Sequence, residues 1–157
     1  MRVGFGYDVH PLVEGRKLIL GGVEIPFEKG LQGYSDADVI LHALCDGLLG
    51  ALGEGDIGKH FPNTDPRYQG ISSRKLLNTV SAMVNEHSLR VENLDLTLLA
   101  EHPPIGPYIS RMKEEISEIL NITAGRVNIK ATTSEGLGFV GEGKGMAAYA
   151  VVLLVAQ

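Results

Sequence analysis

This chain contains one aspartate and two histidines whose positions suggest a metal site. Asp8 and His10 lie two residues apart in a strand-like run, and His42 follows on a segment with a helical pattern. Alternate side chains of a strand project to the same face, so Asp8 and His10 can reach one point in space. One carboxylate and two imidazoles leave a fourth tetrahedral position open, as in a catalytic zinc site. Most isolated Asp-x-His pairs are ordinary surface pairs, so the rest of the chain must decide.

The segment from Ser35 to about Leu52 predicts the helix that carries His42. Ser35 is expected to cap its N-terminus. Asp38 and Asp46 lie four residues on either side of His42 and share its face of the helix. A carboxylate beside a metal-binding imidazole often fixes its tautomer and ring plane. The alternative for both carboxylates is a solvated helix face with ordinary side-chain pairing.

The other elements follow from apolar periodicity and from turn and cap signals. We expect strands at Arg2–His10, Val91–Ala100, Arg126–Thr133 and Met146–Val155, a hairpin over Lys17–Phe27 turning at Gly21–Gly22, helices from Ser72 or Ser73 to about His87 and over Pro107–Leu120, and a loop over 53–70. This order predicts one α/β (α+β) domain, residues 1–157, with one mixed β-sheet and helices packed on one face. The last strand is apolar on both faces, so we expect subunits to associate through their sheets.

Composition narrows the classes of partner. The net charge is −5 and the basic residues are scattered, which argues against nucleic-acid binding. Cys45 is the only cysteine, which favours a reducing compartment. No signal peptide is recognisable, and the most apolar run, Ala147–Ala156, is too short for a membrane-spanning helix. We therefore expect a cytoplasmic protein without a membrane partner.

A second polar cluster follows the predicted strand that ends near Thr133. Thr132, Thr133 and Ser134 offer hydroxyl groups to phosphate oxygens, and Glu135 could bind a magnesium ion that also contacts the phosphate. A plain polar turn is the alternative. The glycine-rich stretch 136–145 fits no nucleotide-binding motif and indicates a sharp turn, in which Phe139 packs either on a ligand or into the core.

Four motifs, in this order along the chain, join these residues: Gly-Tyr-Asp-Val-His, Tyr-Ser-Asp-Ala-Asp-Val-Ile-Leu-His, Gly-Asp-Ile-Gly-Lys-His-Phe-Pro-Asn-Thr-Asp-Pro and Lys-Ala-Thr-Thr-Ser-Glu-Gly-Leu-Gly-Phe. Together they resemble the 2-C-methyl-D-erythritol 2,4-cyclodiphosphate synthase family over essentially the whole chain. The resemblance implies a phosphorus-oxygen lyase of the non-mevalonate isoprenoid pathway. Its substrate is 4-diphosphocytidyl-2-C-methyl-D-erythritol 2-phosphate, whose 2-phosphate attacks the β-phosphorus and expels CMP.

The resemblance also implies roles for individual residues. It implies a homotrimer with active sites between subunits, and zinc, or another divalent transition metal, on Asp8, His10 and His42. A magnesium or manganese ion is implied at Glu135, and transition-state stabilisation by Thr133. Positions implied in substrate binding are Ser35, Asp56, Gly58, Phe61, Thr64 and Asp65 for the methylerythritol phosphate, and Ala100, Pro103, Ala131 and Thr132 for the cytidine phosphate, with Phe139 beside them.

The chain departs from the family pattern at several positions. Tyr34 stands where the family commonly has a histidine that stabilises the transition state, and a phenol supplies no imidazolium charge, so a slower rate or an altered pH dependence is predicted. Asn63 replaces a frequent Asp. Glu142 and Tyr149 replace an Arg and a Glu near a central trimer cavity, so we expect no isoprenoid diphosphate site there.

Two other functions remain open. In a metal-dependent phosphohydrolase, the open zinc position would hold a water nucleophile instead of a substrate oxygen. If Tyr34 disables turnover, the chain would be a trimeric protein that binds a cytidine nucleotide.

Overall fold

The protein, described over residues 1–157 by a computed structural model, is built on a five-stranded sheet with strand order β4-β1-β7-β5-β6. β5 and β6 pair in parallel and the other neighbours are antiparallel, so the predicted mixed sheet is confirmed. The strands of this sheet are β1 Arg2–Glu14, β4 Lys29–Leu31, β5 Leu89–Leu99, β6 Val127–Thr132 and β7 Gly145–Ala156.

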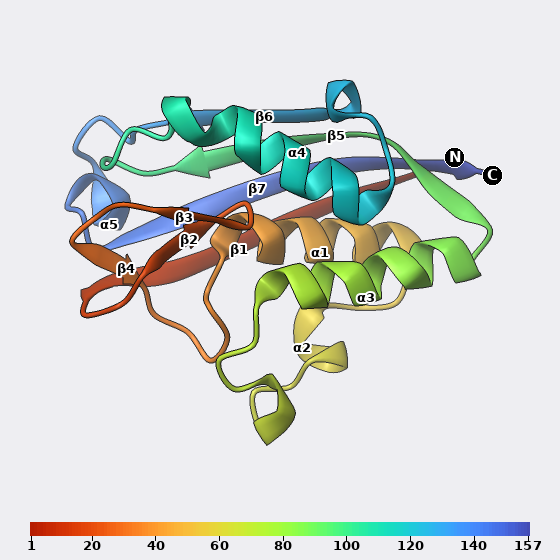
Figure 1. Ribbon diagram of the computed structural model, residues 1–157, viewed down its shortest axis with the longest axis horizontal. Helices are drawn as coiled ribbons and strands as arrows, with labels where there is room; N and C mark the ends of the chain where they lie inside the picture. The colour runs from red at the N-terminus through yellow and green to blue at the C-terminus, as the bar shows by residue number, and fades with distance from the viewer.

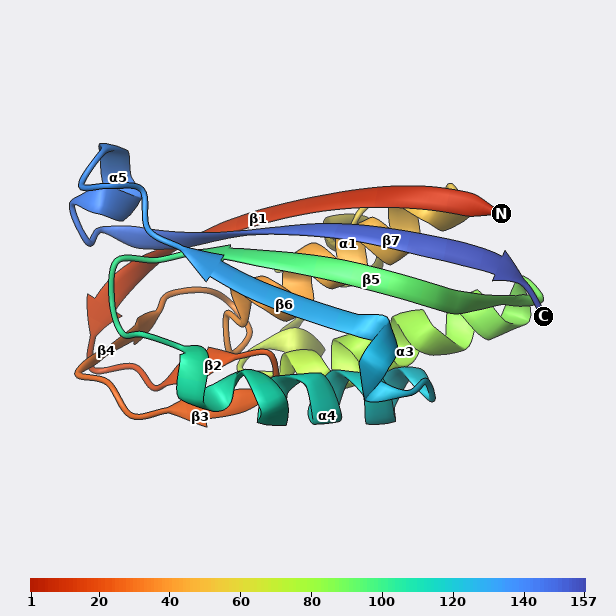
Figure 2. The ribbon, with the colours of Figure 1, turned by 90° about the horizontal axis from the view of Figure 1, so that it is seen from above.

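Three long helices cover one face of the sheet, as predicted (Figures 1 and 2). They are α1 Val39–Leu52, α3 Ser73–Glu86 and α4 Ile109–Leu120, and their apolar sides bury the core against β1, β5 and β7. Two short helices, α2 Ile57–His60 and α5 Gly138–Gly141, and three single 3₁₀ turns, at Pro66–Tyr68, Gly106–Tyr108 and Ala124–Arg126, lie in the connections. No helix combines the length and apolarity that crossing a membrane requires.

None of the three long helices covers the opposite face of the sheet (Figure 2), and exposed apolar side chains lie along β1 and β7. Phe5 is 62% exposed and pairs across the strands with Val151, and Tyr7 pairs with Tyr149. The exposed apolar side chains of these two strands are Val3, Phe5, Tyr7, Val9, Tyr149 and Val151, called the open apolar face below. A group of exposed apolar side chains of this kind is typical of a surface that takes part in an interaction.

Two glycines let α1 lie unusually close to β1. A Cβ atom at Gly4 would be 1.8 Å from the carbonyl oxygen of Gly47, and one at Gly6 would be 1.9 Å from that of Ala43. Any other residue would push the helix away from the strand. This close approach sets the distance between His42 on α1 and the side chains of β1, so the glycines position the candidate site.

Several sequence-based boundaries were wrong. The Lys17–Phe27 hairpin turns at Gly21–Gly22 as expected, but β2 Leu18–Leu20 and β3 Val23–Ile25 form a separate two-stranded sheet. Instead β4, which was missed, pairs with β1 beyond the predicted end of that strand. The 53–70 loop holds α2 and a 3₁₀ turn. The helix expected from Ser35 begins only at Val39, with Asp38 as its N-cap.

Asp38 joins the start of α1 to the hairpin. Its buried carboxylate accepts hydrogen bonds from the backbone amides of Gly21, Gly22 and Leu41, at 2.9, 2.7 and 3.1 Å. Burial, and to a lesser extent the charge of Asp36, raises the pKa of Asp38 to about 7 despite these bonds. The capping carboxyl therefore titrates near neutral pH.

We expect Asp38 to make stability depend on pH. Its pKa lies above the unfolded value of 3.8, so the folded state holds the proton more tightly, and this stabilisation is lost as pH rises through about 7. Between pH 5 and pH 8 the free energy of unfolding should fall by about 2 to 3 kcal/mol on this account. Urea denaturation at both pH values measures it. Asp38→Asn, which keeps a capping side chain without a titrating group, should lack this decrease, and identical pH profiles would refute the assignment.

Candidate active site

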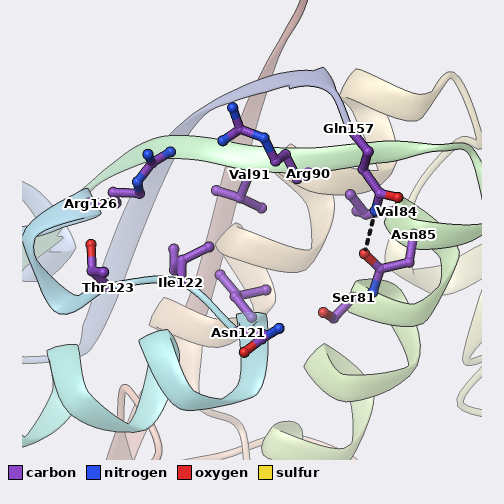
Figure 3. Close-up of a pocket in the computed structure, with 11 residues that line it drawn as sticks. Ser81, Val84, Asn85, Arg90, Val91, Asn121, Ile122, Thr123, Arg126 and Gln157 are labelled. Carbon is purple, nitrogen blue, oxygen red and sulfur yellow. Dashed lines mark hydrogen bonds between the residues drawn. The ribbon is translucent and has the colours of Figure 1, made fainter.

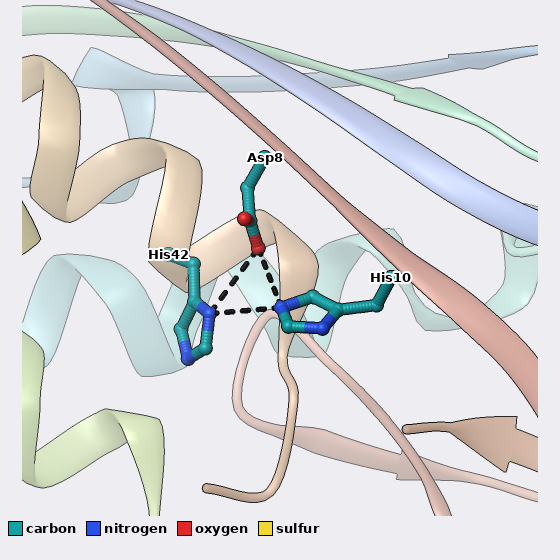
Figure 4. Close-up of side chains that lie close together, drawn as sticks. All are labelled: Asp8, His10 and His42. Atoms are coloured by element: carbon teal, nitrogen blue, oxygen red, sulfur yellow. Dashed lines mark hydrogen bonds and ion pairs between the residues drawn. The ribbon is translucent and has the colours of Figure 1, made fainter. Parts of the chain in front are cut away.

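Asp8, His10 and His42 meet at one point, as the sequence predicted (Figure 4). Asp8 Oδ2 lies 2.8 Å from His10 Nε2 and 3.2 Å from His42 Nδ1, and the two ring nitrogens are 3.1 Å apart. All three residues are largely buried, between β1 and the first turn of α1. The three atoms form a nearly equilateral triangle, and this group could hold a metal ion.

The hydrogen bonds of His10 show which of its nitrogens faces the centre as an acceptor. Its Nδ1 is 2.9 Å from the carbonyl oxygen of Gln32, and a carbonyl can only accept, so the proton of the neutral ring lies on Nδ1. Nε2 then presents a lone pair to Asp8. Asp8 Oδ2 is correspondingly a buried oxygen with no hydrogen-bond donor. A buried acceptor facing another acceptor is unfavourable unless a proton or a metal ion lies between them.

The triangle has the dimensions of a metal site. Bonds of about 2.0 to 2.1 Å from a tetrahedral zinc ion place neighbouring ligand atoms about 3.3 Å apart. The observed separations of 2.8 to 3.2 Å need only a small expansion. Burial acts to raise the pKa of Asp8, but the neighbouring His10 and His42 rings lower it overall, which favours the anionic ligand form. The same carboxylate raises the pKa of His10 against the effect of burial.

The groups around His42 differ from those expected. Asp38 caps α1, and Asp46 Oδ1 accepts a hydrogen bond from the Ile57 amide at 2.7 Å, so neither carboxylate holds the imidazole. Helical spacing placed them on one face but could not show these competing backbone donors. His42 Nε2 instead lies 3.0 Å from Ser35 Oγ and 2.9 Å from Ser73 Oγ.

A cleft of about 370 Å³ opens beside the three metal-binding side chains. Tyr34, Ser35, Gly58 and Phe61 line it, together with Asn63, so the structure brings this part of the predicted site together. The cleft wall comes from the 53–70 segment, which Asp46 fastens to α1 through the Ile57 amide.

Three other residues predicted in this region lie outside the cleft lining. Asp56 caps α2 by accepting a hydrogen bond from the Lys59 amide at 2.9 Å. Thr64 is exposed. Asp65 caps the 3₁₀ turn and accepts hydrogen bonds from the Arg67 side chain, which lower its pKa. All three belong to the same 53–70 segment as the cleft wall.

A second cleft, of about 340 Å³, holds the residues predicted to bind the cytidine phosphate, together with Thr133. Ala100, Pro103, Ala131, Thr132 and Thr133 line it, at the ends of the parallel strands β5 and β6. It shares no lining residue with the first cleft. A single chain thus presents the two halves of the predicted site as separate hollows.

The loop that follows Thr133 is held in a strained conformation. Glu135 has a φ of +55°, in the left-handed region that non-glycine residues rarely adopt. Its amide donates to Thr133 Oγ1 at 3.3 Å, and the preceding amide of Ser134 donates to the Glu101 carboxylate at 2.8 Å. Strain of this kind concentrates at functional sites. Glu101, which carried no sequence signal, thus orients the loop, and the Glu135 side chain is left exposed.

Three residues near the glycine-rich stretch complete the predicted set. Phe139 lies on α5, is 44% exposed and would contact a Cβ at Gly145, so it partly covers the end of β7. The stretch itself forms the short helix α5, where a sharp turn was predicted. Glu142 pairs with Lys144, and the Tyr149 ring packs beside Tyr7 on the open apolar face.

The largest cavity, of about 580 Å³, lies elsewhere, between the C-terminal ends of α3 and α4 and the edge of the sheet (Figure 3). Its only charged lining residues are Arg90 and Arg126, and both donate to the carboxylate of Glu92. The floor includes the apolar side chains of Val84 and Val91. The cavity contains no group placed for acid–base or metal chemistry, so its size does not identify it as the active site.

Comparison with known proteins shows which family the chain belongs to. The family model described as YgbB family matches residues 1–155. A protein of Pelobacter propionicus named 2-C-methyl-D-erythritol 2,4-cyclodiphosphate synthase is 58% identical over 100% of this chain and 99% of its own, and one of the same name from Alkaliphilus metalliredigens is 61% identical over 97% and 96%. The solved CDP complex of Plasmodium falciparum IspF has a TM-score of 0.88 at 33% identity, covering 99% of this chain and 96% of that one. The chain therefore belongs to the YgbB family, with the 2-C-methyl-D-erythritol 2,4-cyclodiphosphate synthases as its relatives.

Proposed function

We propose that this chain converts 4-diphosphocytidyl-2-C-methyl-D-erythritol 2-phosphate to 2-C-methyl-D-erythritol 2,4-cyclodiphosphate and CMP. Full-length relatives at 58% and 61% identity carry the name of this activity. The observation that carries the proposal is the convergence of Asp8 Oδ2, His10 Nε2 and His42 Nδ1 on one open position beside a cleft of suitable size. The attacking oxygen belongs to the substrate, which is consistent with a cleft that offers ligands and hydrogen-bond donors instead of an activated nucleophile.

Asp8, His10 and His42 would hold a zinc ion or another divalent transition metal, because a carboxylate and two imidazoles suit several such metals. When bound, this ion would supply a Lewis acid that neutralises phosphate charge. The chain's own residues would orient the substrate. Ser35 and Tyr34 flank the metal ligands in the cleft, and the 53–70 segment closes one wall against water.

The loop after β6 would hold the leaving nucleotide. Thr133 lines the second cleft, and its hydroxyl can donate to a phosphate oxygen while the amide of Glu135 anchors its oxygen from behind. The exposed carboxylate of Glu135 would take one position on a magnesium or manganese ion, which commonly keeps water and substrate phosphate in its other positions. The strained backbone presets this arrangement before substrate arrives.

We further propose a homotrimer in which each active site lies between two subunits. The open apolar face needs a covering chain, and a second copy supplies a matching apolar surface. The two clefts are separate on one chain, whereas the substrate joins a cytidine phosphate to a methylerythritol phosphate. A neighbour would complete the site by placing its second cleft against the first. The CDP complex of the Plasmodium falciparum relative supports a cytidine nucleotide as ligand.

We expect Tyr34→His to raise kcat by about tenfold at mildly acidic pH. The Tyr34 hydroxyl lies in the first cleft and donates to the Asp65 carbonyl at 3.1 Å, so it offers at most a neutral contact to phosphate. A charged donor stabilises an anion by about 1.5 kcal/mol more than a neutral one. The gain should fade as pH rises and the imidazole loses its proton. Steady-state kinetics across pH measure it, and superimposable profiles for the two proteins would remove this role for Tyr34.

Phosphorus NMR of the purified protein with its substrate and magnesium tests the proposed reaction. The cyclic diphosphate should form together with an equal amount of CMP. The reaction should stop after zinc chelation and resume when zinc is restored. CMP with an open-chain product would instead identify a hydrolase. An unchanged spectrum from folded, metal-loaded protein would identify a nucleotide-binding protein without turnover.

A further inference from the structure

The far nitrogen of His42 lies in a buried cluster of hydroxyl groups. Ser73 Oγ is 2.9 Å and Ser35 Oγ 3.0 Å from Nε2, and both serines are buried. A neutral imidazole carries one proton, on either Nδ1 or Nε2, and only the Nε2 tautomer leaves a lone pair on Nδ1 for a metal. A hydroxyl can donate or accept, so the two serines alone do not determine where the proton lies.

A carboxylate behind Ser73 does determine it. Ser73 Oγ lies 2.5 Å from Asp36 Oδ1, and the Ser73 amide donates to Asp36 Oδ2 at 3.0 Å. An ionised carboxylate only accepts hydrogen bonds, so the one proton of the Ser73 hydroxyl points to Asp36. Ser73 Oγ must then accept from His42, which places the imidazole proton on Nε2.

We propose that Asp36 and Ser73 are positioning residues that hold His42 in the tautomer whose Nδ1 lone pair faces Asp8 and His10. They contact neither substrate nor metal and act only through the imidazole. The inference rests on the proposed metal site, because only the tautomer with the proton on Nε2 lets Nδ1 bind the metal. Mutation of a residue that hydrogen-bonds to a metal ligand commonly lowers metal affinity by about 10- to 100-fold.

The same contacts join the site to the packing of the helices. Ser73 is the first residue of α3, where the backbone amide has no partner within the helix, and Asp36 supplies that partner from the segment before α1. The Asp36 amide in turn donates to the Ile71 carbonyl at 3.0 Å. The seating of α3 beside α1 therefore fixes the ring of His42 as well as the fold.

Two substitutions separate the proposed role from a general loss of packing. Ser73→Ala removes the acceptor that Asp36 orients and leaves Nε2 only the freely rotating Ser35 hydroxyl, so zinc binding should weaken by about 10- to 100-fold. Asp36→Asn should reverse the direction of the two hydrogen bonds that join residue 36, Ser73 Oγ and His42 Nε2, called the relay below. If the Asn oxygen accepts the Ser73 amide proton, its NH₂ group donates to Ser73 Oγ, and the hydroxyl proton turns towards Nε2. The imidazole proton is then driven onto Nδ1, against the metal.

Ser81→Ala is the matched control. Ser81 lies on the same helix, is 9% exposed, and donates a 3.4 Å hydrogen bond to the Ile119 carbonyl far from His42. The same atoms are removed there from a similar environment. Zinc affinity of this variant should remain that of the wild type, whereas the free energy of unfolding should fall to a similar extent in both alanine variants.

Nitrogen-15 NMR of the imidazole groups in chelator-treated protein, at a pH where the rings are neutral, reads the tautomer without metal or turnover. The wild type should show His42 protonated on Nε2, and Asp36→Asn should shift the proton to Nδ1. Competition with a chromophoric chelator then gives the zinc affinity of each variant. A wild-type proton on Nδ1, or zinc affinities of Ser73→Ala and Asp36→Asn equal to that of Ser81→Ala, would overturn the proposal. A wild type with the expected tautomer but no zinc binding would contradict the metal site and leave the relay intact.

Discussion

His42→Ala is expected to abolish stoichiometric zinc binding and to lower kcat/KM by about 10³-fold or more. The substitution leaves only Asp8 and His10 as protein ligands. Catalytic zinc sites commonly have three protein ligands, so two should bind the metal much more weakly. A bound metal contributes several kcal/mol of charge stabilisation to phosphoryl transfer, which corresponds to a loss of about this size. Metal content by mass spectrometry and steady-state kinetics on the same sample measure both effects.

His87→Ala serves as the control for this prediction. His87 lies at the end of α3, where its Nδ1 contacts the Met83 carbonyl and its Nε2 lies 3.2 Å from the Glu54 carboxylate. Removing it deletes the same side chain from a site without metal ligands. Both zinc content and kcat/KM should stay at the wild-type level. A His42→Ala protein that keeps its zinc and its rate would show that the three side chains are not the metal site.

Phe5→Arg is expected to convert the proposed trimer to a folded, inactive monomer. Phe5 is 62% exposed in one chain, so an arginine there hardly disturbs the fold of that chain. In the trimer it would bury a guanidinium without a partner against the apolar side chains of β1 and β7, which costs several kcal/mol at each interface. Light scattering should give a mass near 16.9 kDa in place of about three times that value.

Loss of activity in the Phe5→Arg monomer would follow from the separation of the two clefts. Thr79→Arg introduces the same side chain at an exposed position on the outer side of α3 and should leave mass and activity unchanged. Circular dichroism shows whether the Phe5→Arg chain keeps its helices. A fully active monomer would contradict a site shared between subunits, and a variant that stays trimeric would contradict association through the open apolar face.

The metal ligands were predictable because each has a local signal. Asp8 and His10 follow the two-residue repeat of a strand, and His42 lies on a strongly apolar helix. Their meeting depends on the close approach of α1 to β1, which Gly4 and Gly6 allow, but two glycines in a strand do not by themselves show which element packs against them. Ser73 is 31 residues from His42, and no sequence spacing connects them.

The start of α1 shows why local signals mislead. Ser35, Asp36 and Asp38 are all residue types that cap helices. The choice of Asp38 is tertiary, because its carboxylate also accepts the two amides of the Gly21–Gly22 turn. Ser35 and Asp36 are then left to serve the site through His42 and Ser73.

Other misses had signals of different strength. The strand β4 has three residues with Gly30 at its centre, too short and too permissive for a periodic pattern. The short turns within 53–70 were detectable, because Asp56 and Asp65 both precede them as caps and Pro66 follows at the first helical position. The separation of the two clefts depends on how distant segments fold together, so no local sequence pattern predicts it.

Anomalous diffraction at the zinc edge from crystals of the zinc-loaded protein tests the metal site most directly. The account predicts one strong peak per chain, about 2.0 to 2.2 Å from Asp8 Oδ2, His10 Nε2 and His42 Nδ1, with the fourth position facing the cleft of Tyr34 and Ser35. A peak bound by other side chains, or no peak at these three atoms in protein that turns over substrate, would contradict it.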